Sequence, residues 1–131
     1  MKSMLWSSCI LSLFLMGCAS TPAGRDPEAD RLVQENRAAV MDDVTALAKR
    51  AQMFYRRAVN WGGGGESFAT LVIGSITSKP ANERGTYFVR IASASSAVIV
   101  GVGKAVGNDG TNPVRVSALV KEASIETTVE N

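Results

Sequence analysis

The chain of 131 residues contains no histidine and two cysteines, Cys9 and Cys18. Without histidine it lacks the commonest general base and metal ligand, which excludes Ser-His and Cys-His mechanisms. Its serines do not stand in the G-x-S-x-G or S-x-x-K patterns of serine hydrolases. We therefore predict a protein that is not an enzyme and that uses no metal or cofactor.

Two glycine-rich stretches have the composition of phosphate-binding loops. The run Gly62–Gly65 lacks a following Gly-Lys-Ser/Thr and ends a helical pattern instead of opening one, so a turn is favoured. Residues 101–107 resemble G-x-G-x-x-G with one residue too many, and they lead to a turn, which argues against a dinucleotide site. Residues 108–112 (NDGTN) offer oxygen ligands for Ca²⁺, but Asp109 is the single charge, so a structural turn is favoured and Ca²⁺ binding stays open.

Four residues are candidate interaction residues: Arg56, Arg57, Trp61 and Asp109. The two arginines could contact an acidic partner or a lipid headgroup, although such pairs often complement the C-terminal dipole of a helix. Trp61 precedes four glycines and either fills a gap between helix and sheet or stands exposed as a contact, with packing favoured. The adjacent residues 42 and 43 (both Asp) would lie about 100° apart on a helix, which favours surface positions over a catalytic pair.

The first 17 residues have the pattern of a bacterial lipoprotein signal peptide. Lys2 gives a positive start, and the apolar stretch 4–16 is shorter than the roughly 20 residues that cross a bilayer. This stretch ends in Leu-Met-Gly17-Cys18, which resembles the lipobox of lipoproteins. Gly17 and Cys18 would flank the cleaved bond, Cys18 would carry the lipid, and residues 18–26 would form a polar tether.

Lipidation would make the membrane a partner, through Cys18, and place the protein in the cell envelope. Ala19 follows the cysteine where Asp would favour the inner membrane of enteric bacteria, which indicates the outer membrane. An ordinary secretory signal with a chance cysteine is the alternative. The charges are balanced, 14 Lys and Arg against 12 Asp and Glu, which argues against a nucleic acid as partner.

A long helix is predicted over residues 27–59. Asp26 suits the N-cap and Pro27 the first helical position. Because such a helix is longer than a small domain is wide, its N-terminal part is expected to project. Apolar residues follow at helical spacing and form one stripe: Val33, Val40, Val44, Leu47, Ala51, Phe54 and Ala58.

Strand-like segments follow the glycine run. They are predicted at residues 67–73, 86–91, 97–102 and 114–120, with turn-forming segments at 79–85 and 107–113. The polar residues 124–131 are expected to fray. One helix followed by an antiparallel meander predicts an α+β domain over residues 27–131. The sheet would span about 67–123, with the helical stripe packed on its apolar face.

This order resembles type IV pilins and pseudopilins, in which a long N-terminal helix packs on a small antiparallel sheet. The local sequence is similar to pilin-like proteins of Bacteroidota and related phyla over roughly residues 35–120. The segments that carry this similarity are 35–40 (ENRAAV), 51–57 (AQMFYRR), 61–68 (WGGGGESF) and 103–114 (GKAVGNDGTNPV).

The N-terminus departs from that family. A prepilin continues after its leader with Phe, a Glu at the fifth mature position and an apolar helix, whereas residues 18–22 here lack Glu and the predicted helix carries Asp30 and Arg31, which are costly in lipid. The resemblance therefore implies a lipid-anchored, pilin-like structural or interaction module, working with pilin or secretion-system proteins but not forming the filament core. The alternative is an adhesin-like lipoprotein that binds a ligand or surface near Trp61 or the loop 108–113.

Overall fold

The computed structural model describes residues 26–131, so Gly17, Cys18 and the signal peptide predicted before them lie outside the described residues. The described chain consists of α1 (Pro27–Arg56), the 3-10 turn η1 (Val59–Trp61), the short helix α2 (Ile73–Ile76) and four strands. The strands are β1 (Gly85–Ser93), β2 (Ser96–Val106), β3 (Pro113–Lys121) and β4 (Ile125–Val129).

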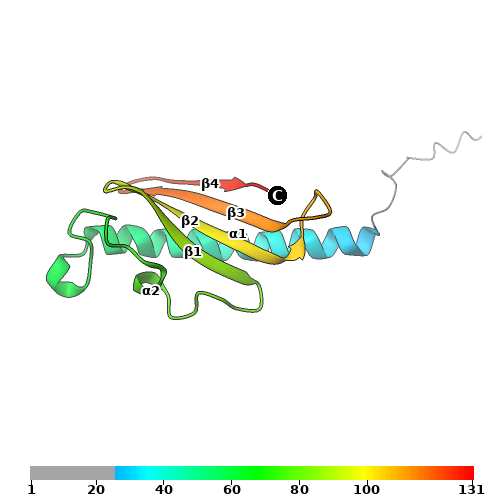
Figure 1. The fold of residues 1–131 in the computed structure, drawn as a ribbon, viewed down its shortest axis with the longest axis horizontal. Coiled ribbons are helices and arrows are strands. Elements are labelled where there is room, and N and C mark those ends of the chain that lie inside the picture. Colours follow the sequence, from blue (N-terminus) through cyan, green and yellow to red (C-terminus); the bar gives the residue numbers. More distant parts are fainter. Residues whose placement is uncertain (1–25) are drawn as a thin grey trace, which may run out of the picture.

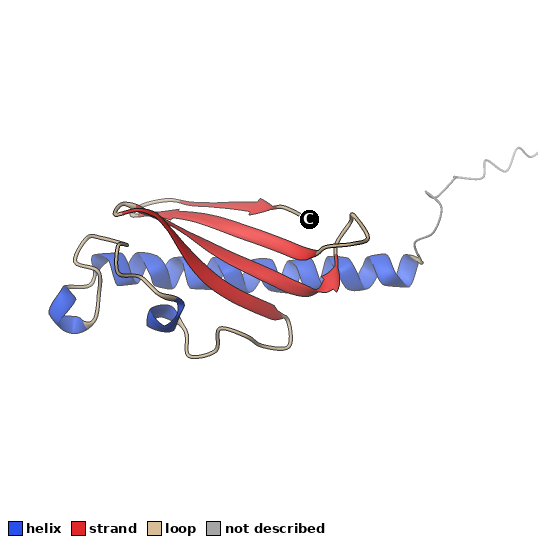
Figure 2. Ribbon diagram, viewed as in Figure 1, coloured by secondary structure: helices blue, strands red, loops and turns tan. Residues whose placement is uncertain are grey.

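The four strands form one antiparallel sheet in the order β1-β2-β3-β4 (Figure 1). Helix α1 lies along one face of this sheet, so the molecule has two layers (Figure 2). The predicted α+β arrangement, with a long helix packed on an antiparallel sheet, is confirmed.

Helix α1 begins where the sequence predicts and ends three residues early. The N–H of Glu28 donates to the Asp26 carboxylate (3.1 Å), and Pro27 occupies the first turn. At 1.5 Å per residue the 30 residues of α1 span about 45 Å. Residues 27–32 are all exposed, and the N-terminal turns extend beyond the sheet (Figure 1), so the expected projection is confirmed.

The core lies between α1 and the sheet. All positions of the predicted stripe are buried except Ala58, which follows the end of α1. Gly101 of β2 allows the helix to approach closely, because a Cβ there would lie 2.6 Å from Val44 and 2.7 Å from Val40. Alternation along the sheet places these strand residues on the helix side: Tyr87, Val89, Ala97, Ile99, Val114, Val116, Ala118 and Val120.

The prediction of a strand at residues 67–73 is wrong. This segment is a loop that leads into α2, and its apolar residues Phe68 and Leu71 are buried at a spacing of three instead of alternating. The Ser67 hydroxyl accepts from the N–H of Ala69 (3.1 Å), and the N–H of Phe68 donates to the carbonyl of Ala94 (2.7 Å). The segment therefore packs its apolar side chains beside the β1–β2 turn. Its backbone is held by these hydrogen bonds and not by pairing with a strand.

The expected fraying of residues 124–131 is also wrong, because they contain β4. A tight turn, in which the N–H of Lys121 donates to the carbonyl of Ser124 (2.9 Å), returns the chain beside β3. Ile125 pairs with Val120 and Val129 with Val116, so the apolar residues of β4 continue the helix-facing side. The sheet consequently spans residues 85–129 and not about 67–123.

Candidate interaction surface

The structure separates the four candidate residues into two groups. Arg56, Arg57 and Trp61 lie at the C-terminal end of α1, which we call the distal end (residues 53–72). Asp109 lies in the proximal loop (residues 107–112), which connects β2 to β3 near the N-terminal half of α1 (Figure 1). The sequence analysis considered the four residues together, but the distal end and the proximal loop lie at opposite ends of the sheet (Figure 1).

The glycine run folds back on the last turn of α1 and satisfies its carbonyl groups. The N–H of Gly64 donates to Phe54 (2.8 Å), that of Gly65 to Arg57 (2.9 Å) and that of Glu66 to Tyr55 (2.7 Å). These donors are consumed within the chain, which matches the predicted turn and leaves them unavailable to a phosphate. The approach requires glycine, because a Cβ on Gly64 would lie 1.9 Å from the carbonyl oxygen of Ser67.

Trp61 does not pack, which corrects the favoured interpretation. Its side chain is 76% exposed, and Val59 in the same turn is 71% exposed. The gap that Trp61 was expected to fill is taken by Phe68, which is fully buried and whose ring lies 4.7 Å from that of Tyr55, centre to centre. The distal end therefore presents large apolar side chains to solvent on a backbone that hydrogen bonds hold in place.

The two arginines have different surroundings. Arg56 donates to the carbonyl of Glu122 (2.8 Å) and ties the end of α1 to the β3–β4 turn. The Arg57 side chain is exposed and lines a groove of about 190 Å³ together with the exposed Met53. Arg57 is thus the better placed of the two to contact a partner, and Arg56 has a structural role.

Asp109 organises the proximal loop from within. Its carboxylate accepts from the N–H groups of Thr111 (2.9 Å) and Asn112 (2.8 Å) and from the Asn112 side chain (2.6 Å). These hydrogen bonds, first of all that from the Thr111 backbone, hold the pKa of Asp109 well below its usual range. Asn131 closes the loop by donating to the carbonyl of Asn112 (3.0 Å). Within residues 26–131 no group of three acidic or thiol side chains has the geometry of a metal site.

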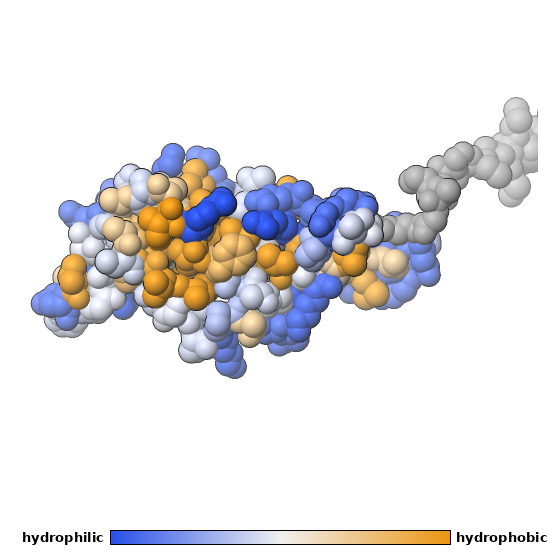
Figure 3. Space-filling model, viewed as in Figure 1, coloured by the Kyte–Doolittle hydropathy of each residue, from blue (hydrophilic) through white to orange (hydrophobic). Residues whose placement is uncertain are grey.

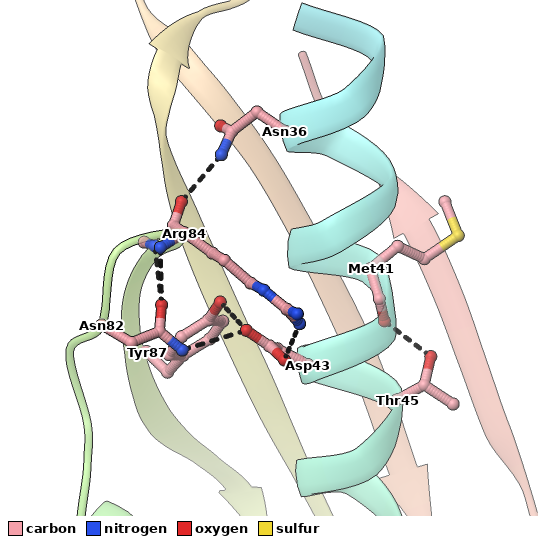
Figure 4. Close-up of polar contacts among 8 residues, drawn as sticks. Asn36, Met41, Asp43, Thr45, Asn82, Arg84 and Tyr87 are labelled. Carbon is pink, nitrogen blue, oxygen red and sulfur yellow. Dashed lines mark hydrogen bonds and ion pairs between the residues drawn. The ribbon is translucent and has the colours of Figure 1, made fainter. Parts of the chain in front are cut away.

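A further polar cluster, centred on Asp43, was not predicted (Figure 4). The Asp43 carboxylate accepts from the Tyr87 hydroxyl (2.5 Å) and from the Asn82 amide (3.1 Å), and it pairs with Arg84 (3.0 Å). Its side chain is only 22% exposed, whereas its neighbour Asp42 is exposed. The cluster joins the middle of α1 to the loop that enters β1.

The electrostatics of this cluster follow from partial burial and from these donors. Burial disfavours the Asp43 carboxylate, but the hydrogen bonds from Tyr87 and Asn82 and the charge of Arg84 outweigh it, so the pKa of Asp43 is lowered. Burial, and then the hydrogen bond to Asp43, raise the pKa of Tyr87 well above its usual range. The pair therefore keeps a charged acceptor and a neutral donor at neutral pH, which suits a structural clamp.

Comparison of the chain with protein-family models, curated proteins and solved structures found no match. Among residues 26–131, no helix combines the length and hydrophobicity needed to cross a membrane. The likeness to pilins stays a prediction from the sequence.

Proposed function

We propose that the protein is a lipid-anchored, non-enzymatic interaction module of the cell envelope, associated with a type IV pilus or a type II secretion-like apparatus. The observation that carries the proposal is the distal end, where Val59 and Trp61 are each more than two thirds exposed on a hydrogen-bonded backbone. Tryptophan is enriched at the energetic centre of protein interfaces, and Trp61 is the most exposed large hydrophobic side chain of the described residues.

The shape of the molecule supports this proposal. An anchor on Cys18 would hold the N-terminal end of the chain at the membrane, and α1 extends about 45 Å from Pro27 to the distal end. The contact residues would thus stand away from the lipid surface, where a filament or secretion subunit is accessible. The anchor itself, its cleavage after Gly17 and the outer membrane as its place remain predictions from the sequence.

The partner contact is tested with the tagged full-length chain, purified from its own membranes in mild detergent. Trp61→Ala is expected to reduce co-purifying pilin or secretion-system components at least about tenfold, because the centre of an interface contributes most of its affinity. Val106→Ala is the matched control, since Val106 is 46% exposed on β2 near the proximal loop. Equal recovery of those components with both variants would contradict the proposal.

The anchor is tested separately by the intact mass of the membrane-extracted protein. The expected mass is that of a chain starting at Cys18 with an acylated, thioether-linked lipid. A mass without lipid would refute the anchor and leave the distal contact to be judged by the Trp61→Ala experiment alone.

A second candidate function is a lipoprotein that binds a ligand or a surface, and one observation favours it. A groove of about 390 Å³ lies beside the proximal loop and is lined by Asp109, Arg115, Glu130 and Asn131, among others. Titration of the protein with Ca²⁺, followed through the amide signals of residues 108–112, tests this function. Saturable shifts would favour it, and unchanged signals at millimolar Ca²⁺ would remove Ca²⁺ as its ligand.

A further inference from the structure

The sheet face opposite α1 is covered by no other element of residues 26–131. Figure 3 views this face and shows hydrophobic residues gathered over the strands, with hydrophilic residues around them. The side chains on it follow from the pairing of the strands and form three rows, of which the first ends in Glu130, the residue after β4. We call this face the open face. Its rows are Thr86-Val102-Arg115-Glu130, Phe88-Val100-Ser117-Thr128 and Arg90-Val98-Leu119-Glu126.

The centre of the open face is apolar and well ordered. Val100 is only 1% exposed although it faces away from the helix, because Phe88 and Arg115 meet above β2, with the guanidinium 5.9 Å from the ring centre. Arg115 is held from its other side by an ion pair with Glu130 (2.7 Å). Phe88 itself remains 38% exposed. The face is therefore a firm, largely apolar platform in which the one central charge, Arg115, is already paired with Glu130.

Two charges on this platform have no counterpart in the described part of the chain. Arg90 on β1 and Glu126 on β4 are exposed, lie in the same row, and make no ion pair within residues 26–131. Three strand spacings separate them, about 14 Å, which is too far for contact within one sheet. One positive edge and one negative edge at the same level form a self-complementary pattern.

We propose that the open face binds the open face of a second copy of this chain. A rotation of 180° about an axis parallel to the strands, midway between β2 and β3, stacks the two sheets and keeps every row at its own level. It brings β1 opposite β4 of the second copy, so Arg90 faces the second copy's Glu126 and Glu126 faces its Arg90. The apolar centres meet between these two ion pairs, at the usual sheet separation of about 10 Å.

The geometry of packed sheets tolerates this register. Aligned sheets are normally rotated by about 30°, which shifts opposing edge strands by roughly 4 Å, close to one residue. Long Arg and Glu side chains at the rim absorb such a shift. Along the remaining rows Arg115 faces Val102 and Glu130 faces Thr86, so like charges are not opposed in this arrangement.

The other two-fold arrangement is disfavoured by the same charges. Rotation about an axis perpendicular to the strands, through the row of Phe88, reverses the levels and places Glu126 opposite Glu130 of the second copy, twice. Like charges in direct opposition destabilise a sheet contact. The favoured arrangement also keeps the two α1 helices parallel, so both N-termini leave from the same end. Under the proposed anchor, both chains could then attach to one membrane.

The contact is small. The open face has only four strands and three rows of side chains. The area that two such faces bury is therefore at the lower limit of the roughly 1,200–2,000 Å² that specific interfaces bury in total. We therefore expect weak association in dilute solution and strong enrichment where two copies share a membrane and have a high effective concentration. The experiments are accordingly made on membranes, with the full-length chain.

A zero-length cross-link tests the register directly. Arg90→Lys keeps the charge and supplies an amine that a carbodiimide joins to a carboxylate in contact with it. We expect a covalent dimer in which the new amine at position 90 is linked to Glu126, and isotope-mixed chains should show that the link joins two copies. Arg90→Lys with Glu126→Gln is the control and should lose this linked peptide. A monomer alone, or links from position 90 to other carboxylates only, would overturn the proposal.

Charge reversal tests the pairing without a new chemical group. Two differently tagged copies are co-expressed and fixed with formaldehyde on intact membranes, and the recovery of one with the other is then measured. Arg90→Glu alone and Glu126→Arg alone should each reduce recovery about tenfold, while the double variant should restore it. Lys49→Glu, on the exposed side of α1, changes the net charge by the same amount as Arg90→Glu and should have no effect.

These outcomes are independent of the proposed function. Trp61→Ala should leave self-association unchanged, because the distal end is not part of the open face. Reduced recovery with both charge reversals and no rescue by the double variant would refute the pairing of Arg90 with Glu126, whatever the result with Trp61→Ala.

Discussion

The distal end and the proximal loop are both rich in glycine, but they expose opposite kinds of side chain. At the distal end, backbone N–H groups of the glycine run satisfy the last carbonyls of α1, so no polar side chain is needed there. Trp61 and Val59 are consequently free to point into solvent. In the proximal loop, side chains form these hydrogen bonds instead: Asp109 accepts from two backbone N–H groups of the turn, and Asn131 donates to one of its carbonyls.

The difference separates candidate contacts from structural residues. A polar side chain in a loop looks functional in the sequence, yet the Asp109 carboxylate is engaged by three hydrogen bonds from its own loop. An exposed Trp61 on a fixed backbone is engaged by nothing comparable and loses little entropy on binding. The distal end is therefore a better candidate for a partner contact than the proximal loop.

The largest expected effect contrasts two aromatic residues of the distal end. Phe68→Ala should destabilise the protein by about 3–5 kcal/mol, because it empties a fully buried position against Tyr55. Trp61→Ala should change the free energy of unfolding by less than about 0.5 kcal/mol, since its side chain is in solvent. Urea denaturation measures both. A cost above about 2 kcal/mol for Trp61→Ala would mean that the residue packs after all.

A second contrast tests whether the glycine run fixes the distal end. Gly64→Ala should cost about 2–3 kcal/mol, because its Cβ would lie 1.9 Å from a backbone oxygen and force the turn to open. Gly74→Ala in α2 is the control, since nothing lies within 4 Å of that position, and it should be neutral or slightly stabilising. Thermal denaturation of the two variants side by side gives the measurement. Equal midpoints would show that the turn yields without cost.

Local patterns predicted the parts of the fold that depend on neighbours in sequence. The predictions of the stripe on α1 and of a strand at residues 114–120 were correct, because burial there repeats with the period of the element itself. Residues 67–73 have strand-like composition, but a distant contact decides their structure, the hydrogen bond from Phe68 to Ala94. The prediction that Trp61 packs failed similarly, because Phe68 already fills that space.

The Asp43 cluster had no local signal at all. Its partners Asn82, Arg84 and Tyr87 lie 39, 41 and 44 residues further along the chain, so only the folded sheet brings them to the helix. Arg56, Arg57 and Trp61 do lie together at the end of α1, because they follow one another within one short segment, and their role in binding stays a prediction. The open face could not be foreseen, since it depends on the register of all four strands.

Asp43 joins α1 to the sheet, whereas the Asp109 carboxylate is hydrogen-bonded within its own loop. Tyr87→Phe removes the hydroxyl that donates to Asp43 and should cost about 1–2 kcal/mol at pH 7. The lowered pKa of Asp43 means that the unfolded chain takes up this proton first. The stability that Asp43 contributes is thus fully present at pH values above 3.8, the ordinary pKa of the group. It is lost as the pH falls through the lowered pKa of the folded state.

The pH dependence sharpens the same test. Tyr87→Phe should flatten the loss of stability below about pH 4, because one of the hydrogen bonds that lower the pKa of Asp43 is gone. Unfolding free energies of both proteins from about pH 6 down to the acid limit of folding measure the slope. An identical slope in the variant would show that Tyr87 does not perturb Asp43.

The smallest effect is expected at the proximal loop. Asp109→Asn replaces one carboxylate oxygen by a donor that faces the Asn112 amide, and it removes the charge that the loop N–H groups stabilise. The amide protons of Thr111 and Asn112 should then exchange several-fold faster, while the unfolding midpoint stays unchanged, because the loop is exposed and touches little of the core. Asp42→Asn, on the exposed side of α1, is the control and should leave both amides as they are. If Asp109→Asn instead lowered the unfolding midpoint as much as Gly64→Ala, the proximal loop would be as important to the fold as the distal end, and the contrast between them would fail.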